Sequence, residues 1–153
     1  MSSSAPELPW DLPDPFVLEV VVAPEQIDEL GHTNNVHYLA WLQDCAWAHS
    51  RARGVDADLM VALGCAMAVR ETRMTYLGAT HAGDRLLVGD WITACDRRLR
   101  AQRSFQIIRA TDRVTVLRAV IDYVCIAVAS GRPARMPDAF ARAYGDDVRS
   151  SPE

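Results

Sequence analysis

The sequence predicts an α+β domain in which a curved, mainly antiparallel sheet of five strands wraps around one long central helix. One apolar helical pattern covers residues 36–53, one strand-like stretch precedes it, and four strand-like stretches joined by short turns follow it. A helix packed against one face of a sheet is a two-layer α+β architecture. With 153 residues, half of them apolar, the chain is long enough for one core and too short for two ordinary domains.

The N-terminal part predicts an arm followed by the first strand. Residues 1–15 contain four prolines, which fit neither a helix interior nor a strand ladder, so we expect a flexible arm that Trp10 can pin to the body. Residues 16–23 are apolar and rich in β-branched side chains, which is typical of a strand. Pro24 closes this strand because it cannot donate a ladder hydrogen bond.

The central helix is readable from the spacing of its apolar face. The positions that follow steps of three and four are Leu39, Leu42, Cys45, Ala46 and His49. Asn34 or Asn35 is a suitable N-cap, because its side-chain oxygen can accept a hydrogen bond from the first turn. Gly54 follows two arginines and is a typical stop. The first half of the helix is apolar nearly all round, so we expect it to be enclosed.

The elements after this helix are short and joined by turns. Residues 56–63 predict a short helix, and the predicted strands cover residues 65–77, 85–95, 103–110 and 114–128. The last strand would span about 50 Å if it were straight, so we expect it to bend. A terminal helix at residues 138–144 precedes a polar tail. The predicted boundaries are therefore an arm at 1–15, a single domain at 16–145 and a tail at 146–153.

Composition excludes several classes of function. A formal net charge of −4 with scattered arginines gives no electrostatic footprint for nucleic acid. The four cysteines form no C-x-x-C pair, so neither a zinc site nor a disulfide framework is indicated. The N-terminus lacks the features of a signal peptide, and no apolar run approaches the ~20 residues of a membrane span. We expect a soluble protein of the reducing cytoplasm, with no membrane partner.

One stretch carries the chemistry: Asp28-Glu29-Leu30-Gly31-His32-Thr33-Asn34-Asn35, directly ahead of the central helix. A carboxylate is ionised at neutral pH, and a helix N-terminus favours that negative charge. The N–H groups of the same helix start can stabilise an oxyanion. Loss of one such donor typically raises the activation free energy by about 3 kcal/mol. The start of this helix is therefore a place where an enzyme can polarise a carbonyl group.

These residues resemble a known family. The pattern D-x-x-G-H-x-N-N-x-x-Y-L-x-W at the start of an enclosed helix, with Gly83-Asp84 before the next strand, resembles the hotdog-fold acyl thioesterases of the 4-hydroxybenzoyl-CoA thioesterase-like group. His32 and the two asparagines also resemble plant acyl-carrier-protein thioesterases. The resemblance covers roughly residues 16–140 and implies a hotdog fold. It implies hydrolysis of an acyl-CoA or acyl-carrier-protein thioester at the interface of a homodimer, and leaves open whether dimers pair.

The resemblance implies roles for individual residues and no metal or redox cofactor, with coenzyme A entering only as part of the substrate. Asp28 matches the family's essential acid, acting as nucleophile or as general base. Asn35 matches the residue whose backbone N–H points at the thioester carbonyl, and His32 matches a histidine of the plant branch. Branches that use a glutamate further along the helix find no match, because this helix contains none. The candidate substrate-binding residues are Gly31, Asn34, Tyr38 and Trp41.

Each of these residues also has a structural interpretation. Asp28 can be a turn residue that bonds its own backbone, and His32 can bond a backbone carbonyl. Asn34 and Asn35 can act as caps only, while Tyr38 and Trp41 suit a core as well as a pocket. A separate basic cluster could hold the phosphates of coenzyme A or be a solvated hairpin connection. Its members are Arg97, Arg98, Arg100 and Arg103.

Two other functions compete with thioester hydrolysis. A hotdog enoyl-CoA hydratase or dehydratase would pair an aspartate with a histidine in the pattern D-x-x-x-x-H, whereas only three residues separate Asp28 from His32. A non-catalytic acyl-CoA-binding module would keep the fold without turnover. The sequence leaves the acyl group, the choice of carrier and the pathway open.

Overall fold

The computed structural model describes residues 7–150 and contains one five-stranded sheet with three α-helices. The elements in chain order are β1 (Phe16–Val21), the 3-10 helix η1 (Pro24–Gln26), α1 (Asn35–Ala52), α2 (Ala57–Leu63), β2 (Cys65–Tyr76), β3 (Arg85–Cys95), β4 (Arg100–Arg109), β5 (Val114–Ala127) and α3 (Asp138–Gly145). None of the helices in this part of the chain is long and apolar enough to cross a membrane.

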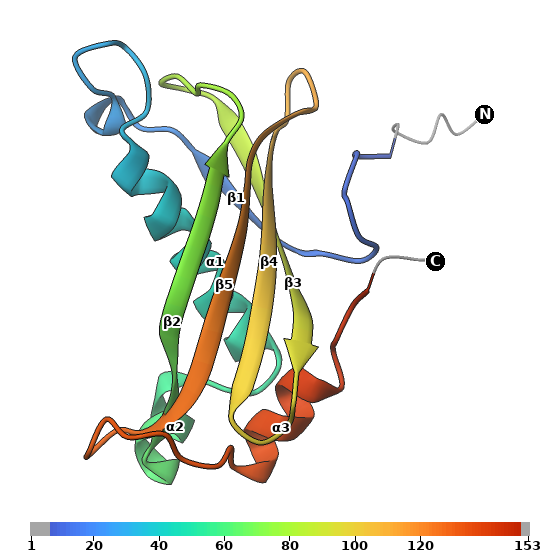
Figure 1. The fold of residues 1–153 in the computed structure, drawn as a ribbon. Coiled ribbons are helices and arrows are strands. Elements are labelled where there is room, and N and C mark those ends of the chain that lie inside the picture. The colour runs from blue at the N-terminus through green and yellow to red at the C-terminus, as the bar shows by residue number, and fades with distance from the viewer. Residues whose placement is uncertain (1–6, 151–153) are drawn as a thin grey trace.

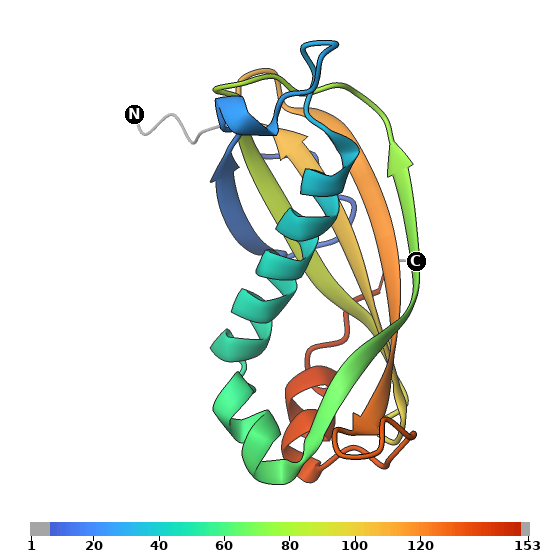
Figure 2. The ribbon, with the colours of Figure 1, turned by 90° about the vertical axis from the view of Figure 1, so that its left-hand side faces the viewer.

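The sheet has the strand order β1-β3-β4-β5-β2, and all neighbouring strands are antiparallel. It curls around α1, with the loop ahead of α1 at one end of the molecule and α2 and α3 at the other (Figures 1 and 2). The register shifts once within each of the pairs β2–β5, β3–β4 and β4–β5. Such irregularities bend a strand and increase its twist, so the expected bending of the long last strand is confirmed.

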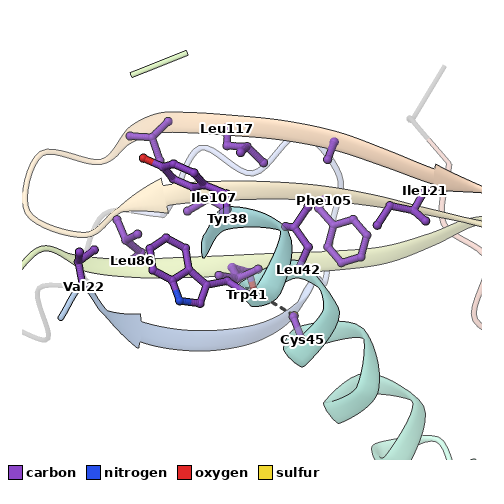
Figure 3. Packing of buried hydrophobic residues seen from close by; sticks show 13 residues of the cluster. Val22, Tyr38, Trp41, Leu42, Cys45, Leu86, Phe105, Ile107, Leu117 and Ile121 are labelled. Carbon is purple, nitrogen blue, oxygen red and sulfur yellow. Dashed lines mark hydrogen bonds between the residues drawn. The ribbon is translucent and has the colours of Figure 1, made fainter. Parts of the chain in front are cut away.

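The main core lies between α1 and the hollow face of the sheet (Figure 3). The helix α1 contributes Tyr38, Trp41, Leu42 and Cys45, all at most 5% exposed. These side chains meet inward residues of the sheet, including Leu86, Phe105, Ile107, Leu117 and Ile121, and Met74 of β2 packs against the same cluster. The opposite side of the helix is open in a single chain, since Val36 is 66% exposed. The predicted enclosure of this helix is therefore one-sided within one chain.

Two local features differ from the expectations. The helix η1 was not predicted, and Pro24 begins it as a first-turn residue instead of only closing the preceding strand. The strand β4 begins at Arg100, three residues earlier than predicted. The side chain of Asp96 accepts hydrogen bonds from the N–H groups of residues 98, 99 and 100, which makes the β3–β4 turn tight and lets the ladder begin at once.

The described part of the predicted arm, residues 7–15, lies against the outer face of the sheet. The Trp10 ring packs edge-on against Trp91, with the centroids 5.8 Å apart. The Gln106 side chain accepts a hydrogen bond from the Asp11 N–H and donates one to the Pro9 carbonyl. The predicted contact of Trp10 with the body is confirmed. Residues 1–6 of the arm and 151–153 of the tail lie outside the described residues.

Gly89 allows the arm to approach the sheet, and its replacement by Ala is expected to destabilise the protein. An added Cβ would lie 2.5 Å from Cζ3 of Trp10, so the indole would have to move away from the sheet. We expect Gly89→Ala to lower the free energy of unfolding by about 1–3 kcal/mol, measured by urea denaturation. In a Trp10→Ala background the same substitution should cost much less. An equal cost in both backgrounds would contradict the contact.

Candidate active site

The loop ahead of α1 is a small hairpin that folds back onto Asp28. The Asp28 N–H donates to the His32 carbonyl at 2.8 Å, and the Gly31 N–H donates to the Asp28 carbonyl at 3.0 Å. Gly31 has a φ of +80°, which a residue with a side chain rarely adopts. The turn therefore explains this glycine, and its predicted contact with substrate stays a prediction.

The Asp28 carboxylate is exposed and held in place on one side. Its Oδ1 accepts hydrogen bonds from the N–H groups of Leu30, at 2.9 Å, and His32, at 3.3 Å. No hydrogen bond or ion pair within residues 7–150 uses Oδ2. The turn interpretation and the chemical interpretation of Asp28 are thus compatible, because the two oxygens can serve different purposes.

The first turn of α1 lies directly after this hairpin. Asn34 is the N-cap, and its side-chain oxygen accepts a hydrogen bond from the Val36 N–H at 3.3 Å. Of the two candidate caps, the structure therefore selects Asn34. Asn35 is the first helical residue, and no hydrogen bond within residues 7–150 uses its backbone N–H. An unpaired N–H at a helix start is a ready donor for an anion or a developing oxyanion.

A chain of buried hydroxyl groups supports the hairpin from below. The Thr80 hydroxyl is 2.8 Å from the Tyr38 hydroxyl and 2.6 Å from the Thr33 hydroxyl. The Thr33 N–H also donates to the Thr80 carbonyl at 2.9 Å. The connection between β2 and β3 therefore braces the loop, and it also places His81 edge-on against His32, with ring centroids 5.3 Å apart. Sequence reasoning missed Thr80 and His81, because no local pattern links them to a motif almost fifty residues away.

Removing the middle hydroxyl is expected to loosen the loop. In Thr80→Val the buried Tyr38 and Thr33 hydroxyls lose a partner, which should lower the free energy of unfolding by about 1–3 kcal/mol. Amide hydrogen exchange at Thr33 should also become faster. Urea denaturation and exchange of the same samples measure both effects. Thr111→Val, at an exposed turn, is the matched control and should change stability by less than about 0.5 kcal/mol.

Two predicted substrate-binding side chains are core residues in this chain. Tyr38 is 3% exposed and packs edge-on against Trp41, which is 5% exposed. Tyr38 also packs against Tyr76 at the end of β2, with centroids 5.7 Å apart. Both Tyr38 and Trp41 therefore position the start of α1, and their predicted contact with substrate stays a prediction.

A separate pocket of about 160 Å³ lies under the second half of α1. Its walls come from α1, α2, α3 and the strands β2, β3, β4 and β5, and none of the predicted catalytic or substrate-binding residues lines it. Much of the wall is apolar and includes Trp47, Met60, Met67 and Ile92. The helix rises about 1.5 Å per residue, so Ala46 in this wall lies about 16 Å along the axis from Asn35.

A buried charged network, which was not predicted from the sequence, borders the pocket. Arg103 donates to Asp90 Oδ2 at 2.7 Å and to the Ser50 hydroxyl at 2.8 Å. His49 Nδ1 lies 2.7 Å from Arg103 Nη1, and His49 Nε2 lies 2.9 Å from Asp147 Oδ2. Asp90 Oδ1 is buried and has no hydrogen-bond partner. The sequence did hold one indication of this network. Asp90 lies in step with Leu86, Val88 and Ile92 along β3, so the strand period places its side chain on the inner face.

Because Arg103 belongs to this buried network, its predicted role in binding phosphate is wrong. Its side chain is 5% exposed and Asp90 is fully buried, so Arg103 cannot reach a solvent-exposed phosphate. Arg97 is paired with Asp146 at 2.8 Å. The cluster expected at residues 97–103 is therefore split between a buried ion pair and exposed side chains. Arg97 and Arg98 lie in the turn before β4, and Arg100 and Arg103 point to opposite faces of that strand.

The cysteines are all free. Burial raises the pKa of the Cys45 thiol well above its usual value, with Asp90 adding to the effect. Burial likewise raises the pKa of Cys125 to about 11, with Cys65 contributing. Because the thiolate is the reactive form, neither group is suited to nucleophilic chemistry.

Comparison with known proteins identifies the architecture. A family model described as the thioesterase-like superfamily matches residues 22–144. A 1,4-dihydroxy-2-naphthoyl-CoA thioesterase from Synechocystis is 22% identical with a TM-score of 0.77, covering 87% of this chain and 97% of that chain. A hypothetical protein from Staphylococcus aureus, solved in complex with CoA, is 18% identical with a TM-score of 0.81, covering 90% and 87%. No curated protein matches this chain by sequence.

The dynemicin thioesterase is similar in the same way, with 19% identity and a TM-score of 0.77 over 88% of this chain and 98% of that chain. At identities this low the likeness shows the fold alone. It confirms the predicted α+β hotdog fold, in which a curved antiparallel sheet wraps around a long helix.

Proposed function

This chain belongs to the thioesterase-like superfamily, and we propose that it hydrolyses an acyl thioester of coenzyme A or of an acyl carrier protein to the free acid and the thiol. One observation carries the proposal. The Asp28 carboxylate is anchored through Oδ1 and keeps Oδ2 available, and it lies in the hairpin that leads into the free N–H of Asn35. An anionic oxygen and an oxyanion donor are the two groups that acyl transfer from a thioester requires.

In the proposed reaction the thioester carbonyl binds at the start of α1. Asp28 either takes a proton from water, so that hydroxide adds to the carbonyl carbon, or attacks that carbon itself to form an acyl anhydride that water then hydrolyses. In both routes the Asn35 N–H donates to the carbonyl oxygen as it becomes negative. Collapse of the tetrahedral intermediate breaks the carbon–sulfur bond and releases the thiolate. Coenzyme A or the carrier protein leaves as product, and the proposed steps need no metal or redox cofactor.

The other loop residues have supporting roles in this proposal. His32 holds Asp28 Oδ1 through its backbone N–H, and its ring faces His81. Asn34 caps the helix, and Gly31 allows the turn. A hydratase would need the Asp28 carboxylate paired with the His32 ring. No such hydrogen bond is formed within residues 7–150, so hydrolysis is the better supported reaction.

We propose that the working unit is a homodimer formed through β2. This strand has twelve residues and is an edge of the sheet, and its Val69 and Tyr76 are 48% and 47% exposed. Trp47 of α1, in the wall of the pocket that β2 also borders, is 44% exposed. A long edge strand beside exposed apolar side chains is a typical surface for pairing with a second copy.

Sedimentation velocity should give the mass of a dimer or a pair of dimers. A monomer at micromolar concentration would contradict this part.

Antiparallel self-pairing of β2 would complete the site. In this pairing, the last residues of one β2 lie beside the first residues of the other β2. The last residues include Tyr76, which packs against Tyr38 at the start of α1. The first residues border the pocket. The catalytic loop of one copy would then face the pocket of the other. The four free cysteines also fit the reducing cytoplasm in which we place this reaction.

The test is release of free thiol from a panel of thioesters that runs from short and long aliphatic to aromatic acyl-CoAs, with an acyl carrier protein thioester as a second arm. Turnover of one acyl class would support the proposal. Loss of a conjugated enoyl-CoA absorbance without free thiol would instead identify a hydratase. Tight acyl-CoA binding with no turnover on either carrier would identify a binding module.

A further inference from the structure

The pocket under the second half of α1 has an open end and a closed end. Gln43 and Trp47 mark the open end, because both side chains are exposed. The closed end contains Ser50, Arg103 and Tyr144, each at most 5% exposed. Polar groups in the interior of an apolar pocket fix the orientation and identity of a ligand. The closed end of this pocket is therefore its selective part.

Strand register explains why these polar groups gather there. Ile92 of β3 is opposite Arg103 of β4, which places Arg103 diagonal to Asp90 on the inner face. Ala101 of β4 is opposite Tyr123 of β5, which places Tyr123 diagonal to Arg103 on the same face. An aspartate, an arginine and a tyrosine on three successive strands therefore point under α1 in a diagonal row.

The charges of this row are balanced within the protein. Burial works against the guanidinium charge, but the Asp90 carboxylate outweighs it and raises the pKa of Arg103, so the side chain remains a cation. That cation is already engaged by Asp90, Ser50 and His49, and it lies 5.6 Å from the centre of the Tyr144 ring. The closed end is thus polar without a net positive charge to offer.

Tyr123 is the group in this row that keeps hydrogen-bonding capacity for a ligand. It lines the pocket, and no hydrogen bond within residues 7–150 uses its hydroxyl. Burial raises the pKa of this phenol, with Arg103 acting in the opposite direction, and it remains a neutral donor. Tyr123 is half-buried, so a bound apolar chain would cover its hydroxyl, which favours a ligand that brings an oxygen to it.

We propose that this pocket holds the acyl group of the substrate and selects an acyl group that carries a neutral oxygen, a hydroxyl or a ketone, near its far end. The inference rests on the proposed thioester hydrolysis, since the thioester would lie at the pocket mouth beside the catalytic loop of a second copy. Gln43 and Ser50 are about 10 Å apart along the helix, which is the reach of an acyl chain of roughly eight carbons. A plain hydrocarbon would leave the Tyr123 hydroxyl without a partner.

A terminal carboxylate fits this pocket less well than a neutral oxygen. The carboxylates of Asp90 and Asp147 already lie on either side of His49 near the closed end. The guanidinium of Arg103 is already paired with Asp90. A third carboxylate would be buried without a cation of its own, which is costly. A hydroxyl or ketone brings no charge and can accept from Tyr123.

The test uses three thioether analogues that cannot be hydrolysed: S-octyl-CoA, S-(8-hydroxyoctyl)-CoA and S-(7-carboxyheptyl)-CoA. Titration calorimetry with the wild-type protein should show the hydroxyl analogue binding roughly tenfold more tightly than S-octyl-CoA, the effect of one hydrogen bond to a donor that the bound chain removes from water. The carboxyl analogue should bind no more tightly than S-octyl-CoA. In Tyr123→Phe the ratio for the hydroxyl analogue should fall to about one. Thr111→Val, which removes a hydroxyl at an exposed turn outside the pocket, should keep the ratio of the wild type.

The outcomes separate this inference from the proposed function. Equal binding of the hydroxyl and plain analogues by the wild-type protein would overturn the inference, even if thioesters are hydrolysed with dependence on Asp28. Tightest binding of the carboxyl analogue would also overturn it, by identifying an anion site. A tenfold preference that Tyr123→Phe abolishes, in a protein that hydrolyses no thioester, would support the pocket assignment and reject the proposed function.

Discussion

Asp28→Asn is expected to lower the rate of thiol release at least a hundredfold while leaving the fold intact. A general base or nucleophile of this kind contributes about 10²- to 10⁴-fold in rate, and an amide can perform neither role. The hairpin should survive, because the amide oxygen of Asn can still accept from the N–H groups of Leu30 and His32. Thiol release under saturating acyl-CoA measures the rate, and sedimentation and circular dichroism measure the retained assembly and fold.

Glu29→Gln is the matched control for this prediction. Glu29 is the adjacent carboxylate in the same exposed loop, and no hydrogen bond or ion pair within residues 7–150 involves its side chain. Its removal changes the local charge by the same amount, so a mere loss of negative charge would affect both variants alike. If Asp28→Asn hydrolyses thioesters as fast as the wild type, the proposed mechanism is wrong.

Arg103→Met is expected to lower the free energy of unfolding by about 3–5 kcal/mol, the largest effect on stability that we predict. The substitution leaves the fully buried Asp90 without its cation, and removing one partner of a buried pair strands the other charge. No other group would compensate the Asp90 charge, because within residues 7–150 Oδ1 has no hydrogen-bond partner and Oδ2 is bonded only to Arg103 and His49. Urea denaturation followed by tryptophan fluorescence measures the loss.

The double variant Asp90→Leu with Arg103→Met tests the cause of that loss. Replacing both members of a buried ion pair by apolar side chains is often close to neutral, so the double variant should be more stable than Arg103→Met alone. The two single effects should therefore sum to well above the effect of the double variant. Additive effects would mean that the two side chains contribute through packing and not through their mutual charge.

Sequence reasoning recovered the elements whose signals are local. The spacing of Leu39, Leu42 and Cys45 determines a helix with one apolar face, and turn residues such as Gly64 determine where elements end. The hairpin motif could be recognised because its carboxylate, its glycine and its cap lie within eight residues. Asn34 and Asn35 could not be separated as caps, since that choice depends on the backbone angles of one residue.

What local patterns could not supply is the pairing of distant segments. Thr80 braces the catalytic loop only because the β2–β3 connection lies beneath it. Arg103 reads as one of four clustered arginines in the sequence, yet the strand alternation turns it inward onto Asp90. A strand pattern predicts two faces, but only the register between strands decides which charges meet.

The sequence by itself thus determined the fold class, the order of the elements and the candidate acid at Asp28, because periodicity, turn chemistry and a compact motif are properties of neighbouring residues. The tertiary structure alone decided that Tyr38 and Trp41 are core residues, that a pocket lies about 16 Å along α1 from the helix start, and that its closed end is polar. These facts depend on contacts between strands and helices far apart in the chain, and no pattern within one segment records such contacts.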